Sequence, residues 1–174
     1  IGETGGSRGL NKSGAGTLVI GADATYTGVT NLNGGVFELA ATRTLATSGI
    51  TLNNSSPTLK VTGDGTFATA ITVRGSGTNT ISVDGAVTLS GLVSLDSGAS
   101  ANRAVVKAGT GTLTLSATQT HTGATTVSAG TLAVSADSGL GNTASTLTLA
   151  AGTTLQVTGA TTIDNAVTLS GAAT

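Results

Sequence analysis

Apolar and polar residues alternate with a period of two in short runs along the whole chain. The runs are three to five residues long, and Gly, Asn, Asp and Ser separate them. This alternation predicts short strands with one buried face, joined by turns, and no segment shows a helical period. The predicted strands are Thr17–Ile20, Val36–Leu39, Ile50–Leu52, Leu59–Val61, Ile71–Val73, Ile81–Val83, Val87–Leu89, Thr112–Leu115, Thr131–Val134, Thr146–Leu149, Thr154–Val157 and Val167–Leu169.

The chain repeats itself internally. The string that begins Lys12-Ser-Gly-Ala-Gly-Thr-Leu matches the string that begins Lys107-Ala-Gly-Thr-Gly-Thr-Leu, at an offset of 95, and the match continues without a gap to Leu39 and Val134. A second echo, Ala-Val-Thr-Leu-Ser-Gly, recurs at an offset of 80, and shorter echoes recur at closer spacing. We interpret these offsets as approximate multiples of one unit of about 20 residues, with the differences caused by variation in loop length.

A unit of about 20 residues with two or three very short strands predicts one coil of a β-solenoid. Coils stacked about 4.8 Å apart pair each strand in parallel with the coils on either side. Leu, Val, Ile and Ala then point inward, and Thr and Ser point outward. The chain length predicts eight or nine coils in a rod on the order of 40 Å long. The alternative is an antiparallel β-sandwich, whose strands are usually longer and would not repeat with so short a period.

The composition narrows the possible functions. The chain has 174 residues, 27 Gly, no Cys, 9% charged residues and a formal net charge of -1. Without Cys there are no disulfides, Cys-ligated metals or thiol catalysis. The low positive charge and 2% aromatic content argue against a nucleic-acid or anionic membrane surface. Disorder is disfavoured as well, because 38% of the residues are hydrophobic.

The repeated residues resemble a known family, the autotransporter-associated β-strand repeat, also called the passenger-associated transport repeat. One copy lies near residues 10–39 and the other near 105–134. Each is similar to a pattern of a Lys-x-Gly-x-Gly-Thr-Leu strand, a Thr-aromatic-Thr-Gly turn and a Gly-Thr-Leu return strand. His121 stands where the pattern has an aromatic residue, as Tyr26 does in the first copy.

The resemblance implies a right-handed parallel β-helix from the passenger of a Gram-negative surface protein. Such passengers are secreted across the outer membrane, and a separate C-terminal barrel anchors them. We therefore expect residues 1–174 to form a single solenoid segment of a longer passenger, located at the cell surface or outside the cell. The missing Cys agrees with that route, because a disulfide formed in the periplasm would obstruct threading.

Parallel β-helices include polysaccharide-degrading enzymes, so a carboxylate pair has to be considered. Asp64 and Asp84 are one predicted coil apart and would form such a pair, or a calcium site, if they stacked. Each precedes Gly, so each is also a typical turn aspartate. We favour the turn interpretation, because no His and no third acid lie nearby in the sequence.

The remaining polar candidates favour structural roles. We expect His121 to be a surface turn residue. The glycine pairs Gly14-Ala-Gly16 and Gly109-Thr-Gly111 resemble phosphate loops, but a strand rather than a helix follows each. Lys12 and Lys107, at equivalent positions, would pair with an acid, cap a carbonyl at a coil corner, or be solvated.

Asn and Thr residues offer two further possibilities. Asn53-Asn54 would contribute to an Asn ladder or simply form a turn. Regular outward Thr rows can bind ice, but the spacing of Thr112-Leu-Thr114 and Thr146-Leu-Thr148 is not a multiple of the short unit, so they should not share a face.

The sequence thus predicts a structural, non-enzymatic segment of a secreted passenger, with no catalytic residue, cofactor or metal. Its expected partners are neighbouring coils or other copies stacked end to end, and possible further partners are host or cell-surface glycans or proteins. We expect no nucleic-acid partner and no membrane contact. The alternatives are an adhesin segment that binds a glycan or host protein directly, and a polysaccharide-degrading β-helix enzyme.

Overall fold

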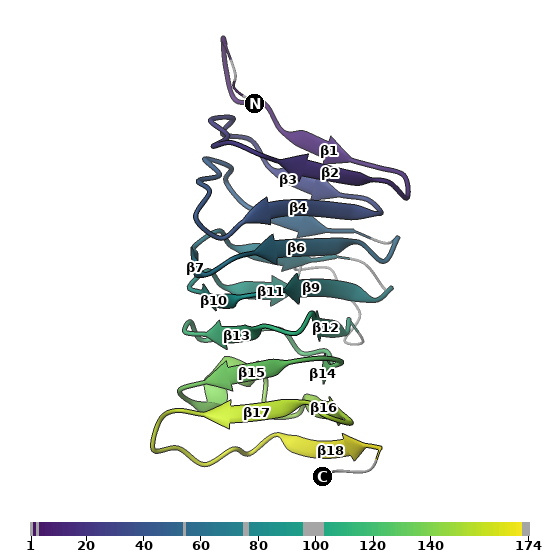
Figure 1. Ribbon diagram of the computed structural model, residues 1–174, viewed down its shortest axis with the longest axis vertical. Coiled ribbons are helices and arrows are strands. Elements are labelled where there is room, and N and C mark those ends of the chain that lie inside the picture. Colours follow the sequence, from purple (N-terminus) through teal and green to yellow (C-terminus); the bar gives the residue numbers. More distant parts are fainter. Residues whose placement is uncertain (1, 3, 54, 75–76, 96–102, 172–174) are drawn as a thin grey trace.

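The protein folds as a stack of β-strand turns. The computed structural model describes residues 2, 4–53, 55–74, 77–95 and 103–171. Among these residues every regular element is a strand except one 3₁₀ turn, η1 (Asp137–Leu140). The chain winds along the long axis of the molecule, so that its two ends lie at opposite ends of the stack (Figure 1). No helix in the described part of the chain is long and apolar enough to cross a bilayer.

Three parallel sheets form the sides of the stack. The first, here the long sheet, contains β2 (Thr17–Ile20), β4 (Val36–Ala40), β6 (Thr58–Thr62), β9 (Asn79–Val83), β12 (Val105–Ala108), β14 (Thr125–Val127), β16 (Thr146–Ala150) and β18 (Ala166–Ser170). The N-terminal sheet contains β1 (Leu10–Lys12), β3 (Thr30–Leu32), β5 (Ile50–Leu52), β8 (Ile71–Val73) and β11 (Val93–Leu95). The C-terminal sheet contains β7 (Gly65–Phe67), β10 (Ala86–Leu89), β13 (Thr112–Leu115), β15 (Thr131–Val134) and β17 (Thr154–Val157).

This architecture confirms the predicted all-β solenoid and excludes the antiparallel sandwich, because every strand pairing is parallel. The turns are fewer and longer than the eight or nine short coils expected. They also differ in length, since one step of the long sheet runs from Thr17 to Val36 and another, longer step runs from Thr80 to Val106. About seven turns are therefore formed.

All twelve predicted strands are present, and in most of them the buried positions alternate as predicted. The exceptions are β5 and β15, in which consecutive residues are buried, and β17 and β18, which are largely exposed. In β9, for example, Asn79, Ile81 and Val83 are buried and the residues between them are only partly buried. Outward residues of the long sheet align in one row, in which Thr58 and Thr80 are followed by Val106 and then by Thr126, Thr148 and Thr168. The missed strands are β1, β3, β7, β11, β12 and β14; all but β12 are three residues long, too short to show a clear alternation.

The core is a set of stacked inward columns. One column of the long sheet runs through Leu18, Phe37, Leu59, Ile81, Lys107, Val127, Leu149 and Leu169. Phe37 and Leu59 are fully buried within it. Lys107 is the exception, because a charged side chain occupies an inward position between two aliphatic neighbours. Lys12 stands in the matching kind of column in the N-terminal sheet, next to Leu32.

The two sequence repeats lie on different sides of the stack. In the first copy, β1 and β3 belong to the N-terminal sheet and β2 and β4 to the long sheet. In the second copy, β12 and β14 belong to the long sheet and β13 and β15 to the C-terminal sheet. Two residues that are 95 positions apart are therefore not separated by a whole number of turns. Our interpretation of this offset as a multiple of the short unit is wrong. The offset of 80 behaves likewise, since β10 and β18 lie in different sheets.

Candidate functional site

The polar side chains that the repeats share gather at the corners where one sheet gives way to the next. Lys12 ends β1, and its side chain is turned into the corner that leads to β2. Its ammonium Nζ donates to the carbonyl oxygens of Ser13 at 3.0 Å, Gly14 at 2.8 Å and Gly34 at 2.9 Å. Gly34 lies 22 residues further on, in the next turn of the stack. The ammonium therefore joins two successive turns.

Lys107 repeats this arrangement at a different corner. Its Nζ lies 2.6 Å from Gly109 O, 2.7 Å from Gly111 O, 2.9 Å from Ala129 O and 3.3 Å from Ala108 O. Ala129 again belongs to the next turn. Only 1% of Lys107 is exposed, and burial lowers its pKa to about 8, against the opposing effect of the Asp84 carboxylate. The amine is still mostly protonated at neutral pH.

A glycine of the next turn closes each of these corners. Gly35 and Gly130 both have a φ of 67°, in the left-handed region that disfavours side chains. A Cβ on Gly130 would lie 2.5 Å from Gly111 O and 2.7 Å from Lys107 Nζ. A Cβ on Gly35 would meet the corresponding atoms, Gly16 O at 2.4 Å and Lys12 Nζ at 2.7 Å. We call each group of Lys, corner carbonyls and closing glycine a lysine cage.

Of the three roles considered for Lys12 and Lys107, the structure confirms the capping of carbonyls at a coil corner. Neither lysine is solvated, since they are 8% and 1% exposed, and neither forms an ion pair among the described residues. The glycine pairs Gly14-Ala-Gly16 and Gly109-Thr-Gly111 are the corner of the cage. The carbonyls of Gly14, Gly109 and Gly111 accept hydrogen bonds from an ammonium, whereas a phosphate loop donates hydrogen bonds through its N–H groups.

Aspartates also link successive turns, but here the side chain accepts a hydrogen bond from a backbone N–H, whereas the lysines donate to backbone carbonyls. Asp23 Oδ1 accepts from the backbone N–H of Thr44 at 2.9 Å, and Asp64 Oδ1 accepts from that of Ala86 at 2.7 Å. Asp137 Oδ1 likewise accepts from the N–H of Asp164 at 2.9 Å. Each bond spans 21 to 27 residues, which is one turn. Much of the sparse charge of this chain is thus used between turns.

Asp64 and Asp84 act separately, as the turn interpretation predicts. The register places Gly65 opposite Val87, so that Asp64 faces Ala86 and bonds to its N–H rather than stacking on Asp84. The Asp84 carboxylate lies 3.4 Å from Lys60 Nζ, and Glu38 lies 3.5 Å from the same nitrogen. These two carboxylates, Asp84 first and then Glu38, raise the pKa of the partly exposed Lys60. No group of three or more metal-ligating side chains occurs in the described part of the chain.

The prediction that His121 is a surface turn residue is wrong. Only 2% of His121 is exposed, and its ring packs against the backbone of Gly141, one turn further on. Burial lowers its pKa, and the Gly123 carbonyl, 3.4 Å from Nδ1, acts in the opposite direction. Tyr26, its equivalent, is also buried, and its hydroxyl lies 2.7 Å from Thr30 Oγ1. The aromatic position of the repeat is therefore an inward position although it lies in a turn motif.

Two separate Asn pairs link successive turns beside the N-terminal sheet, and one of them contains Asn53, which agrees with the ladder interpretation for a single step. Asn53 Nδ2 donates to Asn33 Oδ1 at 2.8 Å, and Asn31 Nδ2 donates to Asn11 Oδ1 at 3.0 Å. Asn54 lies outside the described residues. The Thr pairs weighed for ice binding lie in different sheets, β13 and β16, so they do not share a face.

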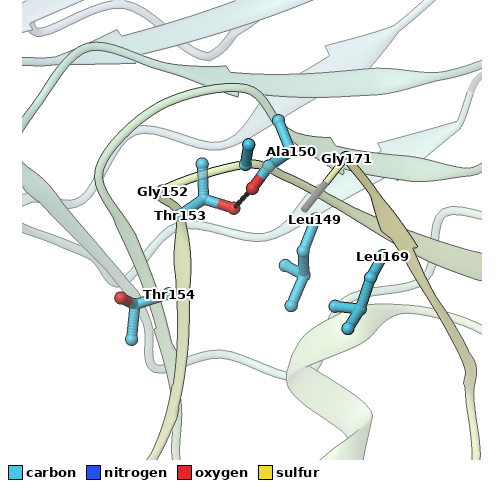
Figure 2. A pocket seen from close by; sticks show the side chains of 8 residues that line it. Leu149, Ala150, Gly152, Thr153, Thr154, Leu169 and Gly171 are labelled. Carbon is cyan, nitrogen blue, oxygen red and sulfur yellow. Dashed lines mark hydrogen bonds between the residues drawn. The ribbon is translucent and has the colours of Figure 1, made fainter. Parts of the chain in front are cut away.

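A pocket lies where the chain turns from β16 to β17 beside the end of β18 (Figure 2). In Figure 2, Thr153 Oγ1 donates to Ala150 O, and this bond is 2.7 Å long. The other walls are aliphatic side chains, among them Leu149 and Leu169, and backbone. None of the lining residues is titratable, so this pocket offers no acid, base or nucleophile stronger than a threonine hydroxyl.

Comparison with known proteins agrees with the repeat that the sequence resembles. The model of the passenger-associated transport repeat matches residues 10–39 and 105–134, which are the two segments that build the lysine cages. The chain is 34% identical over 157 residues to the adhesin BmaC autotransporter of Brucella suis biovar 1 (strain 1330). That alignment covers 78% of this chain and 4% of the relative's length. No solved structure matches the chain at a significant level.

Proposed function

We propose that this chain, which carries two passenger-associated transport repeats, is a structural segment of the passenger of a secreted cell-surface protein. Its role is to extend a rod that supports adhesion or display by other parts of the parent protein. The observation that carries this proposal is the use of the polar side chains: lysines, aspartates and asparagines bond from one turn to the next. Similarity to an autotransporter adhesin supports the cell-surface setting.

The energetics of such a rod are those of a repeat protein. Each turn contacts mainly its two neighbours. The free energy of unfolding is therefore approximately the sum of the stability of each turn by itself and of the interfaces between neighbouring turns. Backbone pairing and stacked inward columns require no particular outward sequence. The outward face is therefore free to vary, and an added or removed turn should change length without changing the fold.

This expectation can be tested by deleting whole turns in the full-length parent protein. Removal of residues 36–57 takes out one full step of the long sheet and places Thr58 where Val36 stood. Removal of residues 47–57 takes out half of that step and breaks the register. We expect the first variant to reach the cell surface and resist protease as the wild type does, and the second to fail. Loss of display in both variants would contradict a modular scaffold.

Direct adhesion is the second candidate function, and the outward row of Thr58, Thr80, Thr126, Thr148 and Thr168 favours it. Val106 interrupts the row between Thr80 and Thr126, so the hydroxyls form two groups with the strand spacing of about 4.8 Å inside each group. Each group is a polar surface for a glycan or a protein. Replacing Thr126 and Thr148 by Val removes both hydroxyls, keeps the β-branched shape and should leave the fold intact. A fall in binding on a glycan array or to host cells, with unchanged surface display, would favour the adhesin over the scaffold.

End-to-end association is part of the proposed function. In the inward columns of the long sheet, Leu147 and Leu149 are 1% and 9% exposed, whereas Val167 and Leu169 of β18 are 46% and 58% exposed. Among the described residues no strand pairs with the outer edge of β18, and such an edge is able to accept another parallel strand. We propose that a second copy of the chain supplies that strand. Light scattering that shows a monomer at high concentration would rule out the second copy.

The enzyme alternative receives no support from the positions of its candidate residues, because Asp64 and Asp84 do not face each other. We expect the substitutions Asp64→Asn and Asp84→Asn to leave any glycan cleavage by the parent protein unchanged. A measured loss of cleavage in either variant would restore the enzyme hypothesis.

A further inference from the structure

We propose that the corner of each repeat is a binding site for a primary ammonium ion, and that the chain fills it with its own lysine. The ammonium, held by carbonyls of two successive turns, fixes how those turns meet at the corner. This inference concerns Lys12, Lys107 and the backbone around them. It does not depend on the role of the parent protein at the cell surface.

The number and placement of acceptors match a primary ammonium group. Such a group has three N–H donors and no acceptor. Around Lys12 Nζ there are three carbonyl oxygens between 2.8 and 3.0 Å. Around Lys107 Nζ there are three between 2.6 and 2.9 Å and a fourth at 3.3 Å. Both cages thus supply one close oxygen for each proton, at distances typical of charge-assisted hydrogen bonds.

Carbonyl oxygens surround each buried ammonium, and no carboxylate of the described residues is in direct contact with it. The Asp84 carboxylate acts on Lys107 only as a longer-range attraction. A buried ammonium is costly unless it is paired or fully hydrogen-bonded. The ion pairs of the described residues all belong to Lys60, so neither cage lysine is paired with an acid in that part of the chain. The partial negative charges of the carbonyls therefore compensate the ammonium at close range. An isosteric apolar side chain would take one donor from each of these oxygens, although Gly111 O would keep its bond from the Thr131 N–H.

Two independent occurrences show that the cage is a property of the local segment. The first cage lies between the N-terminal sheet and the long sheet, and the second lies between the long sheet and the C-terminal sheet. Their surroundings differ, since Leu32 pairs beside Lys12 whereas Ile81 and Val127 flank Lys107. The closing glycine has a φ of 67° in both cages, and a Cβ added to it would lie 2.7 Å from the lysine Nζ in both. The same backbone thus selects the same cation at two corners.

The proposal is tested by chemical rescue at pH 7. The variant Lys107→Ala removes the side chain beyond Cβ, and the removed atoms correspond to n-propylammonium. We expect the variant to unfold at a lower denaturant concentration than the wild type, and n-propylammonium to restore stability in a saturable manner. At ten times its Kd the amine should raise the ratio of folded to unfolded protein about elevenfold. Lys60→Ala, which empties no cage, is the matched control and should show no such rise.

Further probes separate an ammonium site from general salt or solvent effects. Potassium chloride at equal ionic strength and 1-propanol at equal concentration should not rescue, because potassium prefers more ligands and propanol carries no charge. Equal rescue by either, or an equal response of Lys60→Ala, would overturn the proposal. If Lys107→Ala does not fold alone, its refolding yield with and without n-propylammonium gives the same comparison, and so does Lys12→Ala. A Lys107→Met variant as stable as the wild type would also overturn it.

Discussion

Replacing the glycine that closes the second lysine cage should destabilise the protein far more than replacing an equivalent glycine elsewhere. Gly130 and Gly63 both adopt a left-handed backbone, with φ of 67° and 70°. A Cβ on Gly63 meets nothing within 4 Å, whereas a Cβ on Gly130 meets Gly111 O at 2.5 Å and Lys107 Nζ at 2.7 Å. The variants Gly130→Ala and Gly63→Ala therefore carry the same backbone strain. Only Gly130→Ala also places a Cβ against the atoms of a lysine cage.

The expected magnitudes follow from these contacts. An Ala in the left-handed region costs about 1–2 kcal/mol, which is the whole effect expected for Gly63→Ala. At Gly130 the backbone must also move to relieve the overlap, at about 1–3 kcal/mol. Displacing Lys107 from Gly109 O and Ala129 O leaves buried carbonyls without that donor, at about 1–3 kcal/mol. We expect Gly130→Ala to lose about 3–8 kcal/mol in total.

Urea denaturation followed by far-ultraviolet circular dichroism provides the assay. The free energies are comparable only if both variants keep the wild-type m-value, because a solenoid can unfold in parts. A difference between the variants of about 2 kcal/mol or more supports the cage as a tightly built element. If Gly130→Ala and Gly63→Ala lose the same free energy, the close contacts around Lys107 are not rigid and the argument fails.

Three further predictions rest on single residues. Burial lowers the pKa of His121, so the folded protein binds fewer protons than the unfolded chain, and the free energy of unfolding should fall as the pH drops below about 6.5. Urea denaturation between pH 7 and 5 measures this fall. The variant His121→Tyr should not show the fall, because it lacks the imidazole. Phe37→Ala should cost about 3–5 kcal/mol, since Phe37 is fully buried, whereas the exposed Val19→Ala should change little in the same assay. Asp64→Ala should cost about 1 kcal/mol through the lost bond to the Ala86 N–H; no change in the denaturation midpoint would show that this bond contributes nothing.

Most of the fold could be predicted from local pattern. A period of two in runs such as Thr112–Leu115 determines which residues face inward, because side chains on a strand alternate between its two faces. Short runs separated by turn residues, and repeated along the chain, leave stacking as the way to bury those faces. Twelve of the strands and the direction of most of their side chains follow from these two facts, whereas β1, β3, β7, β11, β12 and β14 do not.

The lysine cage could be predicted only in part. The equivalence of Lys12 and Lys107 and their Gly-x-Gly neighbours pointed to a carbonyl cap, but it could not exclude a salt bridge or a solvated side chain. The acceptor that decides the matter belongs to the next turn, 22 residues away. His121 was misassigned for a similar reason, because the ring is covered by Gly141 from the next turn and its own motif contains only polar residues and Gly.

The sequence by itself determined most of the strands, the buried face of most of these and the presence of two equivalent repeats. The tertiary structure alone decided the length of a turn, and hence where each repeat lies. Because the steps along the long sheet are unequal, the offsets of 95 and 80 do not span whole turns, and nearly identical strings occupy different sheets. The physical reason is that strand alternation is a local property of the backbone, whereas the closure of a turn depends on loops and on packing against the turns on either side.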